Sequence, residues 1–180
     1  MTDRPIIFSG PMVRELLAGR KTQTRRLATS PLARCRPGDR LYVRESYAVR
    51  SIFTDIVEVG YSASQQQSHT EYVEQIAIDR AVGAKVTWPK ARPSIHMPRW
   101  ASRLTLIVEE VRVQQLQTIS EADAQAEGIE MVANRSFALG YAMLWNSLHT
   151  VVGQRWSDDP AVVALTFRME RANIDFREGQ

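Results

Sequence analysis

A long run of alternating β-branched residues constrains this chain more than any other feature. Residues 103–116 read Arg-Leu-Thr-Leu-Ile-Val-Glu-Glu-Val-Arg-Val-Gln-Gln-Leu. Their period of two is typical of a strand, because successive side chains of a strand point to opposite faces of a sheet. The run is long enough for a bent strand or a hairpin. A second apolar run, 161–169, predicts a closing strand in the core, so we expect a fold built on a sheet.

The N-terminal third predicts a strand, a helix and a second strand. Residues 5–8 are short, apolar and β-prone. Ser9, with a proline two positions later, is typical of a helix start, and Gly19 is typical of the left-handed residue that ends a helix. After a Pro-Gly turn, residues 41–45 are typical of a strand.

Two more helices are predicted in the C-terminal half. Ser120 and Asp123 fit a capping box, which opens a short helix that Gly128 ends. Residues 137–148 place their apolar side chains on one face of a helix. These elements are short beside the strands, and the pattern favours an α+β class.

Residues 46–102 carry a weaker pattern. Residues 62–68 are polar and rich in glutamine, and two prolines within 88–93 exclude a continuous helix or a central strand. We interpret 46–102 as an elaborating insertion in one domain, because 180 residues are about one domain's worth of chain.

Composition excludes several classes of protein. The chain is 44% hydrophobic and 24% charged, which is ordinary for a globular fold. Its single cysteine, Cys35, has no partner for an internal disulfide, and we expect neither a metal site nor a cofactor. We expect His96 to be a buried core residue. No apolar run is long enough for a membrane span and no signal peptide is visible, which predicts a cytoplasmic protein without a membrane partner.

The basic charge is concentrated at the N-terminus. Residues 1–50 hold eleven Lys or Arg against four Asp or Glu, and twenty of the chain's 23 basic residues are Arg. Arg suits phosphate and base-edge recognition, because its planar fork donates parallel hydrogen bonds. The distribution indicates a nucleotide or nucleic acid partner. A genome-wide preference for Arg, with a solvated basic face, is the other reading.

Residues 18–26 are the most unusual stretch of the chain. Four cations and two hydroxyls follow the glycine that ends the predicted helix. We interpret this stretch as a loop suited to an anionic or carbonyl-bearing ligand. It is not a phosphate-binding P-loop, which needs glycines before its lysine. A solvated basic turn is the alternative.

Residues 19–26, Gly-Arg-Lys-Thr-Gln-Thr-Arg-Arg, resemble the Gly-x-Lys-x-x-Thr-x-Arg signature of the ASCH domain family. This is a family of small β-barrels related to the PUA RNA-binding fold, and the order of the predicted elements matches it. Residues 92–103 resemble a larger, prophage-associated branch of the family. The resemblance implies a single PUA-like domain over 1–180, an α+β barrel of five to six strands with short helices at its rim, and the insertion at about 46–102.

The resemblance also implies an activity. Small bacterial members of the family are amidohydrolases that remove the acetyl group from N4-acetylcytidine with a Lys, a Thr and a Glu. By position, these become Lys21, Thr24 and Glu127. Thr24 would be the nucleophile and Lys21 its base, provided that burial and neighbouring arginines lower the lysine pKa. Glu127 would orient Lys21 or protonate the leaving amine, without metal or cofactor.

Four further residues are candidates for substrate binding: Arg20, Arg26, Glu45 and Trp100. Glu45 has an alternative as a solvated partner of an arginine such as Arg44, and Trp100 has an alternative as a core residue. The alternative function is that of an ASCH module that binds single-stranded RNA or a modified nucleotide. A variant of this alternative is a module that also cleaves RNA as a ribonuclease. The partner is accordingly a modified nucleoside or single-stranded RNA, and the sequence makes no prediction of oligomeric state.

Overall fold

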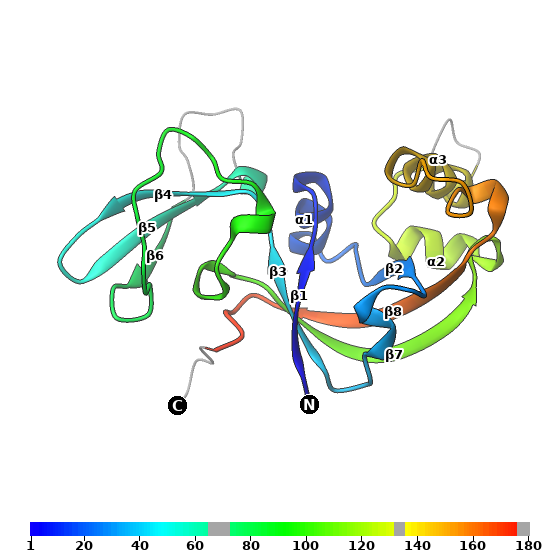
Figure 1. Cartoon of the computed structure of the whole chain (residues 1–180), viewed down its shortest axis with the longest axis horizontal. Helices are drawn as coiled ribbons and strands as arrows, with labels where there is room; N and C mark the ends of the chain where they lie inside the picture. The colour runs from blue at the N-terminus through cyan, green and yellow to red at the C-terminus, as the bar shows by residue number, and fades with distance from the viewer. Residues whose placement is uncertain (65–72, 132–135, 176–180) are drawn as a thin grey trace. The chain divides into compact units, whose positions relative to one another are not determined.

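A computed structural model describes residues 1–64, 73–131 and 136–175 (Figure 1). The fold is α+β, with its strands in two sheets and few helices. The chain separates into two compact units, each assembled from distant segments. The first unit comprises Met1–Thr2, Glu15–Asp39 and Ile107–Met169; the second comprises Asp3–Arg14, Arg40–Leu106 and the chain from Glu170 onward.

Three neighbouring strands form the sheet of the first unit. Their order is β7 (Thr105–Gln115), β8 (Ala161–Glu170) and β2 (Gln23–Leu27), and the first residues of β7 and the last residue of β8 belong to the second unit. In Figure 1, β7 and β8 are long curved ribbons that run side by side. β2 is antiparallel to β8, and Arg25 lies opposite Ala164. The apolar run of β8 therefore supports the charged strand β2.

Two helices pack on this sheet. They are α2 (Glu121–Ala126) and α3 (Phe137–Leu148), and the hydroxyls of Ser120 and Ser136 cap them by accepting backbone N–H bonds. Short 3-10 turns cover Pro31–Arg34, Leu116–Thr118 and Trp156–Asp158. The helices and β8 share an apolar core of Leu116, Ile119, Ala124, Tyr141, Trp145 and Val162. Burial of this core is the main force that holds α2 in place.

The second unit contains the remaining strands. β1 (Asp3–Ile7) pairs in parallel with β3 (Arg40–Arg44). A separate antiparallel sheet has the order β4 (Tyr47–Ile52), β5 (Ile56–Tyr61) and β6 (Val73–Ala77). Short 3-10 turns cover Ser62–Ser64, Ser94–His96 and Arg99–Ala101. β5 alternates strictly between buried and partly exposed residues, so one face of this sheet carries the core.

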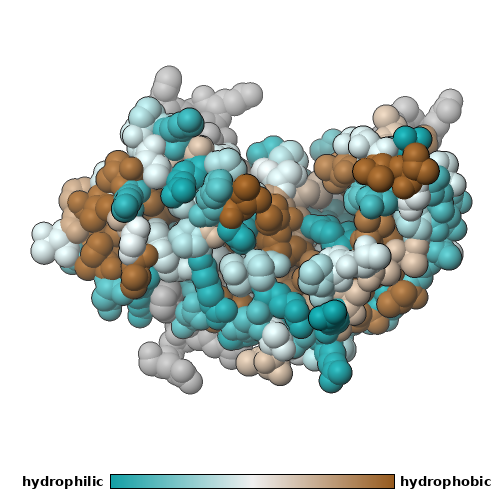
Figure 2. Space-filling model, in the orientation of Figure 1, coloured by the Kyte–Doolittle hydropathy of each residue, from teal (hydrophilic) through white to brown (hydrophobic). Residues whose placement is uncertain are grey.

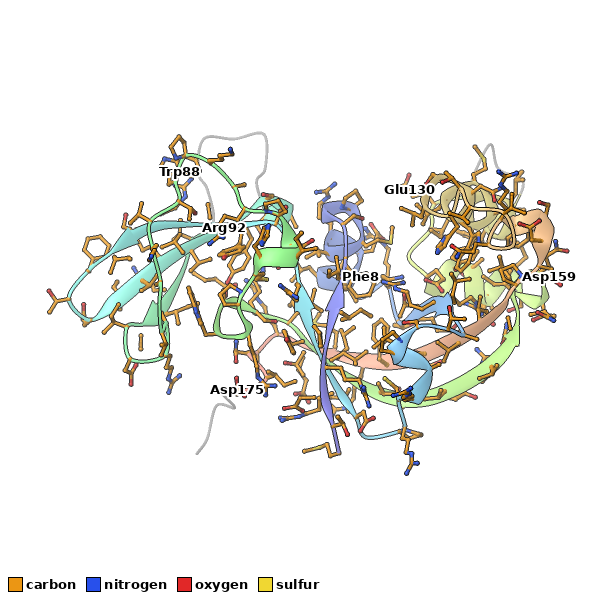
Figure 3. The ribbon with its side chains drawn as sticks, in the orientation of Figure 1. Phe8, Trp88, Arg92, Glu130, Asp159 and Asp175 are labelled. Atoms are coloured by element: carbon orange, nitrogen blue, oxygen red, sulfur yellow. The ribbon has the colours of Figure 1, made fainter. Side chains whose placement is uncertain are left out.

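The chain after β6 returns along the edge of β4. The amides of Thr87 and Trp88 donate to the carbonyl of Val49, and Tyr47 and Arg92 exchange two backbone hydrogen bonds. Figure 3 labels Trp88 and Arg92 on this returning segment. Covering the edge of β4 satisfies its backbone groups and prevents pairing with another chain.

The helix α1 (Gly10–Leu17) begins after Ser9, and Gly19 adopts a φ of +72° just beyond its end, as predicted. The predicted helix at 137–148 and the strands near 5–8, 41–45, 103–116 and 161–169 are also confirmed.

Two expectations about local structure were wrong. The basic stretch is not wholly a loop, because β2 begins at Gln23 and its charged side chains are paired internally. Residues 46–102 contain the sheet β4–β5–β6 despite their weak sequence pattern, and the glutamine-rich residues 65–68 lie outside the described part of the chain. His96 is exposed, because it lies in a short turn between two prolines, where its amide donates to the Pro93 carbonyl and its own carbonyl accepts from the Tyr47 hydroxyl.

The expectations about the whole fold are confirmed only at the level of its class. The α+β class is confirmed, whereas a closed PUA-like barrel and a single domain with an insertion stay predictions. Residues 46–102 fall in the second unit together with β1 and β3. Within the described ranges, no helix is both long enough and apolar enough to cross a bilayer.

Candidate functional site

The end of α1 determines where the basic motif lies. Gly19 turns the chain back, and the amides of Arg20 and Lys21 both donate to the carbonyl of Glu15, at 3.0 and 3.1 Å. The next amide, that of Thr22, donates to the carbonyl of Ala126 at 2.8 Å. The chain leaving α1 is thereby fastened to the end of α2, and Lys21 forms an isolated antiparallel bridge with Glu127.

Gly128 makes this close approach possible. Its φ is +75°, and a Cβ at this position would lie 2.8 Å from the Cβ of Glu15 and 3.0 Å from the Cβ of Lys21. Only glycine combines the left-handed conformation with that lack of space. Gly128 directly follows Glu127, which is the C-cap of α2. One glycine therefore ends the helix and admits the segment that carries Lys21.

Lys21 and Glu127 form a buried ion pair. The Lys21 Nζ donates to the Glu127 Oε2 at 2.9 Å and to the Glu127 carbonyl at 2.8 Å. The two side chains are 2% and 5% exposed. Two residues that are 106 positions apart, and that the family resemblance placed in one site, are thus in direct contact.

Arg25 completes this cluster from β2. Its NH1 donates to the Glu127 Oε1 at 3.1 Å, and its NH2 donates to the Asp123 Oδ2 at 2.7 Å. Gln23 supports both partners, because it accepts from Arg25 NH1 and donates to Asp123. The ring of Tyr141 lies over the guanidinium, 6.0 Å from Cζ to the ring centroid. Each oxygen of the Glu127 carboxylate accordingly faces its own cation.

The environment of the cluster shifts the pKa of several of its members. Burial lowers the pKa of Lys21, the charges of Arg26 and Arg25 lower that pKa further, and Glu127 only partly opposes them. Burial also raises the pKa of Tyr141 well above its usual value, and the charge of Glu127 adds to that effect. For Asp123, burial would raise the pKa, but the hydrogen bond from Gln23 and the charges of Arg25 and Arg112 outweigh it and lower that pKa.

Thr24 is held by a different partner. The NH1 of Arg26 donates to the Thr24 Oγ1 at 2.8 Å and to the carbonyl of Arg25. Thr24 and Arg26 are two residues apart on β2 and therefore lie on the same face of the strand. An arginine that donates to a hydroxyl oxygen stabilises the alkoxide form of that hydroxyl.

Arg20 points away from this cluster. It forms an exposed bidentate pair with Glu15, with distances of 2.6 and 2.7 Å. Both residues line a cavity of about 520 Å³, whose walls also include Thr22, Gly128 and Glu130. Figure 3 labels Glu130 beside α2 and α3. Lys21, Thr24 and Glu127 are not among the described residues that line this cavity.

Glu45 and Trp100 belong to the second unit. Glu45 is buried and accepts two hydrogen bonds from Arg103, at 2.8 and 3.0 Å. Its partner is therefore a buried arginine, and not Arg44. Burial raises the pKa of Glu45, although Arg103 opposes that shift. Trp100 is half-buried and packs against the core of this unit near Met97. Substrate roles for both residues stay predictions.

Sequence reasoning missed four members of the cluster: Gln23, Arg25, Asp123 and Tyr141. One signal was available, since Asp123 and Glu127 are four residues apart and share a face of α2. Asp123 was interpreted only as a capping residue, but its carboxylate bonds to Arg25 instead. In the described part of the chain, no three His, Cys, Asp or Glu residues are grouped to hold a metal ion.

Comparisons with known proteins address the fold. Neither a scan of protein-family models nor a search of curated proteins finds a significant match. Among solved structures, the chain is similar to hypothetical protein PH0355, with 10% identity, a TM-score of 0.50, and coverage of 94% of this chain and all of that one. Protein EF3133 from Enterococcus faecalis V583, of the family DUF984, has 11% identity, a TM-score of 0.47, and coverage of 99% of this chain and 86% of that one. At such identities, the likeness to PH0355 concerns the fold alone.

Proposed function

We propose that this protein is an amidohydrolase of the ASCH family that removes an acyl group from N4-acetylcytidine or a related modified nucleoside. The observation that carries the proposal is the buried contact of Lys21 with Glu127, next to a motif in which Thr24 is held by Arg26. Lys, Thr and Glu are the residue types that the family resemblance implies, and a PUA-like barrel is the fold that goes with them.

The environment of Lys21 supports its role as a base. A lysine removes a proton at neutral pH only if its amine is uncharged, and burial among arginines acts in that direction. Thr24 is a poor nucleophile as a hydroxyl, and the hydrogen bond from Arg26 favours its alkoxide. Arg26 is therefore assigned to stabilising negative charge, first on Thr24 and then on the acyl oxygen.

The reaction proceeds in two steps. The Thr24 Oγ forms a bond to the acyl carbon while its proton moves to Lys21, and the bond from that carbon to N4 then breaks as N4 takes up a proton. Water next attacks the acyl carbon and loses a proton to Lys21. The bond from that carbon to the Thr24 Oγ breaks, Oγ takes the proton from Lys21, and acetate is released. Neither step needs an oxidant, a reductant or a second substrate.

The use of the N-terminal cations favours catalysis over RNA binding. Lys21 and Arg25 are buried against carboxylates, and Arg20 and Arg40 pair with Glu15 and Asp3. These four of the eleven N-terminal cations are paired within the chain, which reduces the charge that the first 50 residues can offer to a phosphate backbone.

The test is turnover of free N4-acetylcytidine by the purified chain, followed as appearance of cytidine by liquid chromatography. We expect turnover without added metal, and we expect Lys21→Ala to abolish it. Lys21→Arg is the matched control for charge, because it keeps the cation but provides no base at neutral pH. Full activity in either variant would refute the assignment of Lys21.

Thr24 is tested in the same assay. Thr24→Ser keeps a hydroxyl and should retain part of the activity, whereas Thr24→Ala should lose at least about a hundredfold. Unchanged activity of Thr24→Ala would mean that water attacks the substrate directly. Absence of turnover by the unmodified chain, together with salt-sensitive binding of single-stranded RNA, would replace the proposal with the RNA-binding function.

A further inference from the structure

The two oxygens of Glu127 are engaged by different donors. Oε1 accepts from Arg25 NH1 at 3.1 Å, and Oε2 accepts from Lys21 Nζ at 2.9 Å. A guanidinium has donors only, so Oε1 cannot carry a proton toward Arg25. A carboxylate held in this way is an acceptor on both sides, which bears directly on whether Glu127 donates a proton or orients Lys21.

The contacts of Lys21 also have a direction. A neutral amine has two N–H bonds and one lone pair. Lys21 contacts the Oε2 of Glu127 and the backbone carbonyl of the same residue, and both are acceptors. With two N–H bonds given to Glu127, the lone pair of the amine is directed away from that residue. Glu127 thus sets the orientation in which the amine accepts a proton.

Arg25 is itself fixed in place. Its NH2 bonds to Asp123 at 2.7 Å, its NH1 also contacts Gln23, and its side chain is completely buried. Asp123 is held in turn by Gln23 and Arg112. The guanidinium therefore stays at a fixed position beside the Glu127 carboxylate, and it cannot follow solvent or exchange partners as a surface arginine does.

We propose that Arg25 is the positioning residue of this site: it holds one oxygen of the Glu127 carboxylate while Lys21 contacts the other, and it thereby fixes the direction in which Lys21 acts as the base. The inference rests on the proposed function and resolves the role of Glu127 within it. Lys21 takes the proton of the Thr24 hydroxyl and returns the same proton to the departing N4. In this arrangement Glu127 orients Lys21 and does not act as the proton donor.

The direction of the expected effect follows from the charged groups around the amine. Glu127 from α2 and Arg26 and Arg25 from β2 act on the amine, and Asp123 and Tyr141 contact Arg25 in turn. Removing Arg25 deletes a cation and the hydrogen bond that it donates to Glu127 Oε1, so the Glu127 charge acts more strongly on Lys21. Both changes favour the protonated amine, so the pH at which Lys21 loses its proton must rise.

The test observes Lys21 directly and does not require turnover. The chain has three lysines, Lys21, Lys85 and Lys90, so selective ¹³C labelling at the lysine ε-carbon gives three NMR signals. Lys85→Arg and Lys90→Arg assign them, and these two exposed lysines serve as internal controls. The signals are followed against pH in the unmodified chain, in Arg25→Met and Arg25→Lys, and in Glu127→Gln.

We expect the Lys21 midpoint to rise by about one pH unit or more in Arg25→Met, less in Arg25→Lys, and to fall in Glu127→Gln. Lys85 and Lys90 should not move. Opposite shifts in two variants cannot come from a general loosening of the fold. An unchanged Lys21 midpoint in Arg25→Met, or in Arg25→Lys if the methionine variant does not fold, overturns the inference.

The pH profile of kcat separates this inference from the proposed function. With Lys21 as the only proton carrier, kcat rises through the Lys21 midpoint and then stays level, and the rise moves upward in Arg25→Lys. A descending limb in the unmodified chain would make Glu127 a proton donor and refute the role assigned here. Absence of turnover beside a shifted NMR midpoint would refute the amidohydrolase alone and leave the coupling of Arg25 to Lys21 standing.

Discussion

Replacing Arg103 with methionine tests the energetics of the second unit. The Arg103 Nε and NH2 donate to the two oxygens of Glu45, and the side chains are 2% and 1% exposed. The guanidinium also lies over the ring of Tyr61, 4.0 Å from its centroid. Arg103→Met removes these interactions and also the longer ion pair with Glu74, whose Oε1 lies 3.6 Å from Arg103 NH1, while it keeps most of the apolar volume.

The magnitude follows from the carboxylate that is left behind. Breaking a buried ion pair by removing one partner costs about 3–5 kcal/mol, because the other charge stays buried without compensation. The lost cation–π contact is worth about 2 kcal/mol when desolvated, but it shares the same guanidinium and does not simply add. We expect the free energy of unfolding to fall by about 3–5 kcal/mol at pH 8, a large part of the stability of an ordinary domain.

The loss depends on pH in a defined direction. Burial raises the pKa of Glu45 even with Arg103 present, and without Arg103 that pKa rises further. A folded state that binds a proton more tightly than the unfolded state becomes less stable as pH rises. The deficit of Arg103→Met should therefore be largest at pH 8 and shrink toward pH 5, as the raised pKa of Glu45 makes it take up a proton more readily.

Urea unfolding at the two pH values measures these differences. The double variant Glu45→Gln, Arg103→Met removes the buried charge and should be more stable than Arg103→Met at pH 8. Arg168→Met is the matched surface control, because Arg168 and Glu109 are 55% and 51% exposed and 4.0 Å apart, and it should cost less than about 1 kcal/mol. A loss of less than about 1 kcal/mol in Arg103→Met, or equal losses in the single and double variants, would refute the reasoning.

Two further predictions concern the elements that carry the candidate site. Gly128→Ala places a methyl group 2.8 Å from the Cβ of Glu15 at a φ of +75°, so it should destabilise the chain by about 1–3 kcal/mol. The same change should displace Glu127 and thereby alter the Lys21 NMR signal. An unaltered Lys21 signal would contradict this prediction. Ser120→Ala removes the hydroxyl that caps α2 and should cost about 1 kcal/mol in urea unfolding, whereas Ser120→Asp, which can cap in the same way, should restore that stability.

The surface of α3 carries an apolar patch. Several large apolar side chains of this helix are exposed, namely Leu139, Met143 and Leu148. Figure 2 shows brown, apolar atoms over the part of the surface where Figure 1 places α3.

Much of the secondary structure could be predicted from the sequence, because it depends on local rules. The β-branched alternation near 103–116 specifies a strand wherever its partners lie, and Gly19 and Gly128 end helices because they adopt positive φ. Ser120 caps α2 through a hydroxyl three residues from the amide that it binds. The basic motif was also visible, since its residue types stand out in any context.

The tertiary structure alone decided what those cations do. Whether Arg25 faces solvent or carboxylates depends on contacts with residues about 100 positions away, and no local pattern encodes them. Glu45 likewise pairs with Arg103 and not with its sequence neighbour Arg44, because the fold buries Arg103 beside Glu45. Charge is fixed by composition, but burial and partner set the protonation state, and both arise only when distant segments meet.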